Sequence, residues 1–333
     1  MKLRKVLAMG LIAAMTLSLS ACGSSKEGGS NETATKDDGK TYNVGICQLV
    51  QHDALDAATK GFKDVLTEKL GDKVTFDEQN AQGDSPTCAT IVNSFVSANV
   101  DLIMANATAP LQAAVAGTAD IPVLGTSVTD YATALDIKEW KGTTGINASG
   151  TSDLAPLDQQ AAMIKELFPD AKKVGLLYCS AEANSAYQIK TIKTYLEKDG
   201  YTCTDFSFVD SNDIASVVAN ASKNSDVIYI PTDNTAAANT EVIKNTCVPA
   251  KVPVVAGEAG ICSGCGVATL SISYYDLGRT TGEMAYEVLV NGADPSTMEV
   301  KFAPNVTKQY NESICEELGI EIPEGYEKIE AGE

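Results

Sequence analysis

Hydrophobic residues follow two different patterns along this chain, and each pattern predicts one kind of element. Short continuous runs of apolar, β-branched and aromatic residues, such as 101–107 and 226–232, are typical of buried strands. Between such runs, apolar residues recur three or four positions apart, as Leu55, Ala58, Phe62 and Val65 do, which is typical of amphipathic helices. The pattern therefore predicts strands that alternate with helices over most of the chain.

This alternation of strands and helices occurs twice. The predicted strands of the first half cover 42–49, 73–79, 101–107 and 121–126, and those of the second half cover 172–179, 201–208, 226–232 and 252–257. Continuous apolar strands that alternate with helices form parallel sheets covered on both faces. We therefore predict an α/β protein with two Rossmann-like lobes, each built on a parallel sheet.

The C-terminal part of the chain is expected to add to both lobes. It contains predicted strands at 266–273 and 298–303 and a predicted helix at 276–291. We expect the chain to cross back between the lobes here, so that several hinge crossings join them. The predicted domains are 41–147 plus 272–298 for lobe one and 148–271 plus 299–333 for lobe two.

The N-terminal residues predict export and anchoring, not a folded domain. Lys2, Arg4 and Lys5 precede an apolar run at 6–19 that is too short to cross a bilayer and indicates a signal peptide, assigned to 1–21. The run ends in "LSAC", which resembles the lipobox of bacterial lipoproteins and implies a lipid such as palmitate on Cys22. The alternative is an ordinary secretory signal with a chance cysteine. The polar segment 22–40 is expected to be a flexible tether that holds the protein at the outer face of the cell membrane.

Charge and side-chain chemistry exclude several classes of partner. The formal net charge is −19 at pH 7, and −22 without the three basic residues of the predicted signal peptide. Such a surface repels phosphate backbones, so nucleic acid is not expected as a partner. His52 is the only histidine, and Cys262 and Cys265 form the only C-x-x-C motif. Neither has enough neighbouring ligands for zinc, so we expect no metal and no cofactor, and the two cysteines are expected to form a local disulfide or to stay free.

Small polar residues gather where the predicted strands end. In an open parallel sheet, ligands bind at the carboxyl ends of the strands. The alternative for each loop is that these residues only cap helices and shape turns. The candidate ligand-binding residues at the strand ends and crossings are Gln51, His52, Asn80, Thr108, Thr129, Asp130, Glu182, Asn184, Ser185, Asp233, Asn234, Glu258 and Tyr274.

The residues around "SAEANS" indicate the chemistry of the ligand. A helix that begins at Asn184 or Ser185 directs unpaired backbone N–H groups at the strand end, where they favour a carboxylate. Glu182, Asp233 and Glu258 supply the negative charge that an ammonium group requires. A carboxylate and an ammonium in one cleft predict a free amino acid as ligand.

The same segments resemble a known family. "QHDALDAATKGF", "QNAQGD", "TGINASGTSDLAP", "AEANSAYQ", "IYIPTDNTAAA" and "SISYYDLGRTTGEMA" are similar to the ABC-transporter substrate-binding proteins typified by tryptophan- and tyrosine-binding lipoproteins. The resemblance implies a type I periplasmic-binding-protein fold, a monomer, and delivery of an aromatic amino acid to separate permease and ATPase subunits. Tyr131, Tyr187 and Tyr274 are the candidates for contacts with the side chain of the ligand, with core packing as the alternative for each.

Three other functions agree with the sequence to different degrees. An enzyme is not expected, because no G-x-S-x-G elbow, second histidine or Gly-rich phosphate loop is present. A surface adhesin or sensory lipoprotein would use the same anchor and fold. A binder of another small solute, such as a sugar or nucleoside, is the third alternative.

Overall fold

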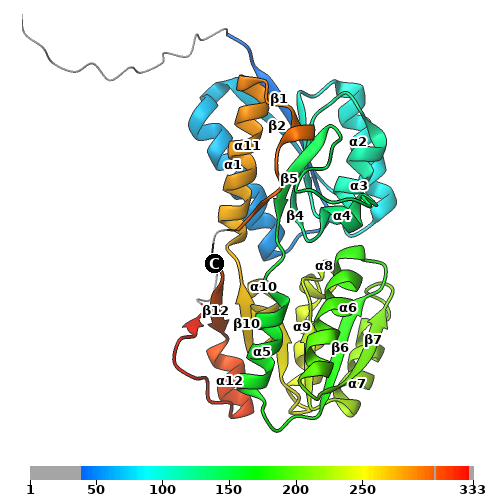
Figure 1. The fold of residues 1–333 in the computed structure, drawn as a ribbon, viewed down its shortest axis with the longest axis vertical. Helices are drawn as coiled ribbons and strands as arrows, with labels where there is room; N and C mark the ends of the chain where they lie inside the picture. Colours follow the sequence, from blue (N-terminus) through cyan, green and yellow to red (C-terminus); the bar gives the residue numbers. More distant parts are fainter. Residues whose placement is uncertain (1–38, 304, 330–333) are drawn as a thin grey trace, which may run out of the picture. The chain divides into compact units, whose positions relative to one another are not determined.

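The computed structural model describes residues 39–303 and 305–329, which belong to one compact unit. The predicted signal peptide, Cys22 and nearly all of the predicted tether lie outside the described residues. The described part is built from two lobes, each with its own sheet (Figure 1). Within it, no helix combines the length and apolar character needed to cross a bilayer.

The first lobe is built on a six-stranded sheet in the order β11-β5-β4-β3-β1-β2. Every neighbouring pair in this sheet is parallel. The strands are β1 (Tyr42–Gln48), β2 (Val74–Asn80), β3 (Leu102–Asn106), β4 (Val123–Val128), β5 (Ala148–Ser152) and β11 (Lys301–Phe302).

Helices cover both faces of the first sheet. They are α1 (Asp53–Leu70), α2 (Ser85–Ala98), α3 (Thr108–Gly117), α4 (Tyr131–Ala134) and α11 (Tyr274–Asn291), with short 3₁₀ helices η1 (Gly71–Lys73) and η2 (Pro295–Thr297). One apolar core joins the sheet to α2 and α3 through residues such as Phe95, and another joins it to α1 and α11 through residues such as Phe62. A sheet buried on both faces explains why its strands are continuous apolar runs.

The second lobe is built on a seven-stranded sheet in the order β13-β12-β10-β9-β8-β6-β7. Its strands are β6 (Lys173–Cys179), β7 (Thr202–Phe208), β8 (Val227–Ile230), β9 (Val254–Ala256), β10 (Ala268–Ser271), β12 (Thr307–Tyr310) and β13 (Glu327–Lys328). All neighbours are parallel except β10 and β12, which are antiparallel. The strands β12 and β13 were not predicted, because they are short and only partly buried or exposed.

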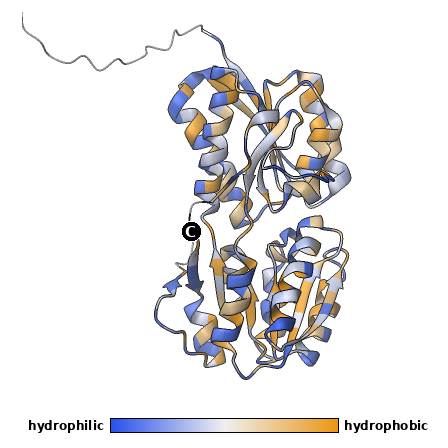
Figure 2. Cartoon of the chain, viewed as in Figure 1, coloured by the Kyte–Doolittle hydropathy of each residue, from blue (hydrophilic) through white to orange (hydrophobic). Residues whose placement is uncertain are grey.

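The helices of the second lobe enclose two apolar cores. They are α5 (Leu157–Leu167), α6 (Ala183–Lys198), α7 (Ile214–Asn224), α8 (Asn234–Ala237), α9 (Thr240–Cys247), α10 (Ala259–Cys265) and α12 (Glu312–Leu318). In both lobes the apolar residues concentrate on the strands and on the helix faces that cover them (Figure 2). The predicted α/β class and the two parallel-sheet lobes are confirmed.

The chain passes between the two sheets three times, after β5, after β10 and after β11. Two segments lie in a different lobe from the one expected. Residues 148–152 and 301–302 were assigned to lobe two, but β5 pairs with β4 and β11 pairs with β5, so both extend the first sheet. The Ser149 hydroxyl also donates to the Met298 carbonyl at 2.9 Å, which holds β5 to the segment that precedes β11. The first crossing therefore follows β5.

Candidate functional site

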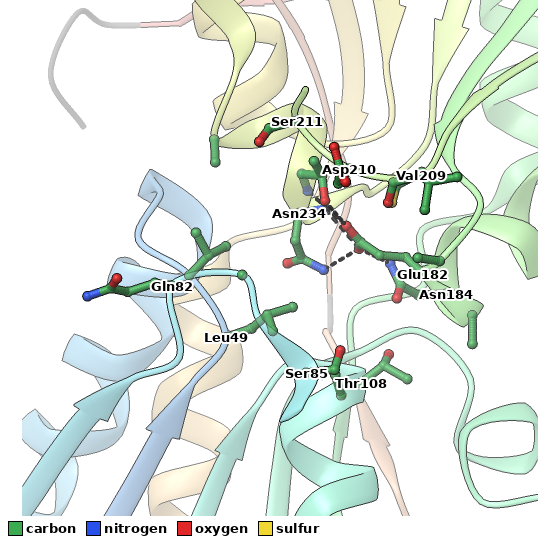
Figure 3. Close-up of a pocket in the computed structure, with 18 of the residues that line it drawn as sticks. Leu49, Gln82, Ser85, Thr108, Glu182, Asn184, Val209, Asp210, Ser211 and Asn234 are labelled. Atoms are coloured by element: carbon green, nitrogen blue, oxygen red, sulfur yellow. Dashed lines mark hydrogen bonds between the residues drawn. The ribbon is translucent and has the colours of Figure 1, made fainter. Parts of the chain in front are cut away.

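A cavity of about 210 Å³ lies between the two lobes (Figure 3). Its walls come from the segments that follow six strands, β1, β2 and β3 of the first lobe and β6, β7 and β8 of the second. The lining residues include Leu49, Val50, Gln82, Ser85, Thr108, Ala109, Ala181, Glu182, Ala183, Asn184, Val209, Asp210 and Asn234. The carboxyl ends of the parallel strands of both sheets thus face one shared cavity, as the sequence predicted for the ligand site.

One part of the cavity wall is apolar. Leu49 and Val50 follow β1, and Val209 follows β7 on the opposite lobe. Val209 directly follows β7, an edge strand that is itself largely exposed, and it is 61% exposed. These side chains provide an apolar surface that a ligand can cover.

The helix α3 begins at the cavity without a side-chain cap. Its N-cap residue is Ala107, with φ of 105°, and no side chain accepts a hydrogen bond there. Thr108 and Ala109 are the first helical residues and both line the cavity. The first turn of a helix carries amide donors without intrahelical partners and a partial positive charge. This end of α3 therefore suits an anion.

The helix α6 presents a second N-terminus to the same cavity. It begins at Ala183, one residue before the predicted start, and its N-cap residue Glu182 makes no side-chain capping bond. Ala183 and Asn184 line the cavity. The alanines leave space beside these amide groups, as expected from the sequence.

The Glu182 carboxylate is held by the segment after β8. It accepts from the backbone N–H and the side-chain amide of Asn234 at 3.0 and 2.7 Å, and from the backbone N–H and hydroxyl of Thr235, both at 2.8 Å (Figure 3). The Asn184 amide adds a bond of 3.1 Å. Glu182 therefore caps α8, although it precedes Asn234 by 52 residues in the sequence.

The other two acids of the expected ammonium site also act as caps. Asp233 accepts from the backbone N–H groups of Cys179 at 2.6 Å and Ala236 at 2.8 Å. Glu258 accepts from the backbone N–H groups of Gly260 at 2.6 Å and Ile261 at 2.5 Å. Burial raises the pKa of both carboxyls, and the neighbouring Glu182 raises the pKa of Asp233 further. Both are buried and neither lines the cavity.

The other predicted site residues fall into three places. Thr108, Asn184 and Asn234 line the cavity with Glu182, and Asp130 lies in a small adjoining pocket beside Tyr187. Gln51 and Asn80 line a separate polar groove beside α1 and β2, outside the cavity. The buried residues Thr129, Ser185, Asp233, Glu258 and Tyr274 are absent from the cavity wall.

His52 connects the two lobes. Its Nε2 atom lies 3.2 Å from Oδ1 of Asn234, and its Nδ1 atom is buried without a hydrogen-bond partner. The residues that the structure describes contain no group of three or more His, Cys, Asp or Glu side chains that could hold a metal ion. The eight cysteines among them, Cys262 and Cys265 included, are free thiols, and all but Cys203 are buried.

Two of the three candidate tyrosines are buried in the protein. Tyr131 donates to the Thr151 carbonyl at 3.2 Å and stacks on Trp140 with ring centroids 6.5 Å apart. Tyr274 donates to Asp153 at 3.0 Å. Tyr187 alone is near the cavity, in the adjoining pocket.

Sequence reasoning missed two parts of the site. Residues 209–211 follow β7 and line the cavity, but the end of this strand was not counted among the polar strand ends. Asp153 follows β5 and is 3% exposed, with bonds from the Thr129 hydroxyl at 2.9 Å and from Tyr274. It was missed because β5 was assigned to the other lobe, and the small polar residues of 149–153 carry no apolar run that would mark a strand end.

Comparison with known proteins places the chain among binding proteins. Residues 43–331 match the family described as ABC transporter substrate binding protein. A tyrosine-binding protein of Clostridioides difficile is 36% identical over 293 residues, covering 86% of this chain and 85% of that protein. These matches are to binding proteins, which confirms the expectation that the chain is not an enzyme.

Solved structures show the same architecture. A crystal structure of an ABC domain in complex with L-Trp from Streptococcus pneumoniae is 34% identical, with a TM-score of 0.83 over 87% of this chain and 100% of that chain. A ligand-free, open structure of a substrate-binding protein with adhesive properties from Clostridium difficile is 36% identical, with a TM-score of 0.67 over 87% of this chain and 99% of that chain. With the two sheets and three crossings, these matches confirm the predicted type I periplasmic-binding-protein fold.

Proposed function

Because this chain belongs to the ABC transporter substrate-binding protein family, we propose that it binds a free aromatic amino acid, tyrosine or tryptophan, in the cavity between its lobes. The amino acid is then delivered to a separate permease and ATPase. The relatives named above support this class of ligand, since one is a tyrosine-binding protein and another was solved with L-Trp.

The observation that carries the proposal is the pair of uncapped helix N-termini at one cavity. Thr108 and Ala109 of α3 and Ala183 and Asn184 of α6 approach it from opposite lobes, and neither helix has a side-chain cap. A carboxylate between them would accept charge-assisted hydrogen bonds from backbone amides of both lobes. Binding of the carboxylate thereby holds the lobes together.

The rest of the cavity suits the other parts of an amino acid. Its volume of about 210 Å³ lies below the range of roughly 300–1,000 Å³ that is usual for drug-sized ligands, so it fits one small molecule. The apolar side chains of Leu49, Val50 and Val209 can cover an aromatic ring. The exposed Asp210 also lines the cavity, and it supplies negative charge for the ammonium group.

The proposed mechanism is a shift between lobe arrangements. The ligand contacts both lobes only when they close around it, so its binding favours the closed arrangement. The permease then recognises the closed protein. We also propose that Cys22 carries a lipid that keeps the protein at the outer face of the membrane.

A second candidate function is adhesion at the cell surface. It is favoured by the relative from Clostridium difficile, which is described as a substrate-binding protein with adhesive properties. Adhesion uses the outer surface and does not require an amino acid in the cavity. A variant with a blocked cavity that still adheres to host cells would therefore separate the two functions.

The proposal is tested by filling the cavity. Ala181 is exposed and lines the cavity, so Ala181→Trp should occupy the ligand space without disturbing the core. In a thermal-shift screen of the twenty amino acids, we expect tyrosine or tryptophan to raise the Tm of the wild type. Calorimetry should then show at least a tenfold loss of affinity in Ala181→Trp, about 1.4 kcal/mol or more.

The matched control is Ala186→Trp, which adds the same side chain to an exposed position of α6 outside the cavity wall. It should bind like the wild type. If no amino acid shifts the Tm of the wild type, the amino-acid proposal is wrong. If Ala181→Trp binds as tightly as Ala186→Trp, the ligand site lies elsewhere.

A further inference from the structure

Three segments that belong to different parts of the fold meet at the Asp153 carboxylate. Asp153 lies on the first crossing, directly after β5. Its Oδ1 atom accepts from the Thr129 hydroxyl at 2.9 Å, and its Oδ2 atom accepts from the Tyr274 hydroxyl at 3.0 Å. Thr129 follows β4, and Tyr274 is the first residue of α11, directly after the second crossing. One carboxylate thus joins two crossings and a strand end.

The same set of hydrogen bonds reaches the wall of the cavity. The side-chain amide of Gln188 on α6 donates to the Thr129 hydroxyl at 3.3 Å, across the boundary between the lobes. It also lies 3.3 Å from the carbonyl of Asn184, one turn earlier in α6, and Asn184 lines the cavity. Gln188 accepts in turn from the backbone N–H of Thr232 at 3.1 Å. The position of the α6 N-terminus is therefore linked to Asp153 through Gln188 and Thr129.

Asp153 differs from the other acids near the cavity. The buried Asp233 and Glu258 accept from backbone amides of their own lobe, which do not change partner when the lobes move. Glu182, which is half-buried, likewise accepts from backbone and side-chain groups of its own lobe. Asp153 instead accepts from two side-chain hydroxyls, and one of these hydroxyls contacts the opposite lobe. Hydroxyl donors can rotate to other acceptors or to water. Opening of the lobes would break the bond between Gln188 and Thr129 and so free the hydroxyl that donates to Asp153.

We propose that Asp153 is a positioning residue for ligand binding, whose carboxyl group acts with Thr129, Tyr274 and Gln188 as a latch that fixes the closed arrangement of the lobes. This inference rests on the amino-acid binding function proposed above. Asp153 does not line the cavity, so it acts on the ligand only through the position of α6 and the crossings.

The latch couples closure to proton uptake. Burial raises the pKa of Asp153 from an ordinary value of 3.8 to about 6, against the opposing effect of the two hydroxyl donors and of His52. The titratable groups that face it are His52 before α1, Tyr131 of α4 and Tyr274 of α11, and Glu258 faces Tyr274 in turn. Opening admits water and lowers the pKa toward 3.8, so the closed form binds more protons between these pH values. Closure is therefore favoured as the pH falls.

The test measures protons taken up with the ligand. The wild type is titrated at pH 5 with the tightest-binding amino acid, in buffers of different ionisation enthalpy. We expect an uptake that approaches one proton per ligand, and an affinity that weakens roughly tenfold between pH 5 and pH 7. Asp153→Asn cannot ionise, so it should lose both effects. Thr129→Val removes one donor to the carboxylate, raises its pKa and should extend the proton uptake to higher pH.

The matched control is Asp226→Asn, which alters an acid that accepts from the backbone N–H groups of Lys172 and Lys173, away from the cavity wall. It should keep the proton uptake of the wild type. Equal uptake in the wild type and Asp153→Asn would overturn the latch, as would a pH profile that Thr129→Val leaves unmoved. If Asp153→Asn does not fold, the pH profile of proton uptake by Thr129→Val tests the latch by itself.

Failure of the binding function is distinguished from failure of the latch. If the wild type binds no amino acid, the proposed function fails, and hydrogen exchange of the ligand-free proteins tests the latch. Loss of the latch should raise exchange in 126–134 and 183–189 of Asp153→Ala relative to Asp226→Ala, because Asp153→Ala removes the acceptor of the Thr129 hydroxyl that Gln188 contacts. Equal exchange in the two variants would overturn the proposal.

Discussion

At the scale of single residues, the acidic side chains between the lobes differ in the groups that donate hydrogen bonds to them. Glu182, Asp233 and Glu258 were expected to receive an ammonium group, but backbone N–H groups already occupy their oxygens. A buried carboxylate with such donors stabilises the loop that it caps. These acids build the shape of the second lobe's half of the site, whereas the exposed Asp210 leaves negative charge at the cavity itself.

Asp233 offers a test of this structural role. Its two oxygens accept from the end of β6, at Cys179, and from the first turn of α8, at Ala236. In Asp233→Asn one of these N–H groups loses its acceptor, and we expect the free energy of unfolding to fall by about 1–3 kcal/mol in urea denaturation. Asp84→Asn is the control, because Asp84 is an exposed N-cap and asparagine caps equally well. Equal stability of the two variants would contradict this role.

At the scale of elements, two helices of the first lobe, α1 and α11, touch through their backbones. A methyl group at Gly278 would lie 1.9 Å from the Ala58 carbonyl oxygen, and one at Gly61 would lie 2.1 Å from the Tyr275 carbonyl oxygen. The two backbones touch at these glycines, and a salt bridge between Arg279 and Glu68 at 2.8 Å lies beside them. Since α11 follows the second crossing, this contact fixes the hinge to the first lobe.

The predicted consequence is a graded loss of stability along α11. Gly278→Ala forces the two backbones apart and should lower the free energy of unfolding by about 1–3 kcal/mol or more. Gly282→Ala, one turn later, meets its nearest atoms at 2.9 Å, so a smaller shift accommodates it. In urea denaturation, the free energy of unfolding of Gly278→Ala should be clearly lower than that of Gly282→Ala. The reverse order would show that the helices do not pack through Gly278.

The elements themselves were largely predictable from the sequence, and their partners were not. Continuous apolar strands such as 102–106 and 227–230 are recognised from periodicity alone, and the rule for parallel sheets then brings their carboxyl ends together. The lobe to which β5 belongs depends on its pairing with β4, which local pattern does not encode, and Asp153 was missed with it. Likewise, no local signal shows that Glu182 caps a helix that begins 52 residues later.

At the scale of the whole molecule, buried acids set the pH dependence of stability. Burial raises the pKa of Asp153, Asp233 and Glu258. A carboxyl whose pKa is higher in the folded state binds more protons there than in the unfolded chain, so the free energy of unfolding rises as the pH falls toward the unfolded pKa. The strong net negative charge acts in the same direction, because protonation reduces self-repulsion.

We therefore expect the protein to be more stable at pH 5.5 than at pH 8. The urea midpoint should be higher at the lower pH, and Asp153→Asn should reduce the difference because it removes one of the three carboxyls. Measurements in 0.5 M salt screen the net charge and leave the effect of the buried groups. A midpoint that rises with pH in high salt would contradict this assignment of the buried acids.

The late return of the chain to the first lobe has a consequence for biogenesis. The helix α11 and the strand β11 complete that lobe, yet they are synthesised after nearly the whole second lobe. An emerging chain therefore cannot complete the first sheet until residue 302 is available. The N-terminal lobe, although it begins first, is finished only after most of the second lobe has been synthesised.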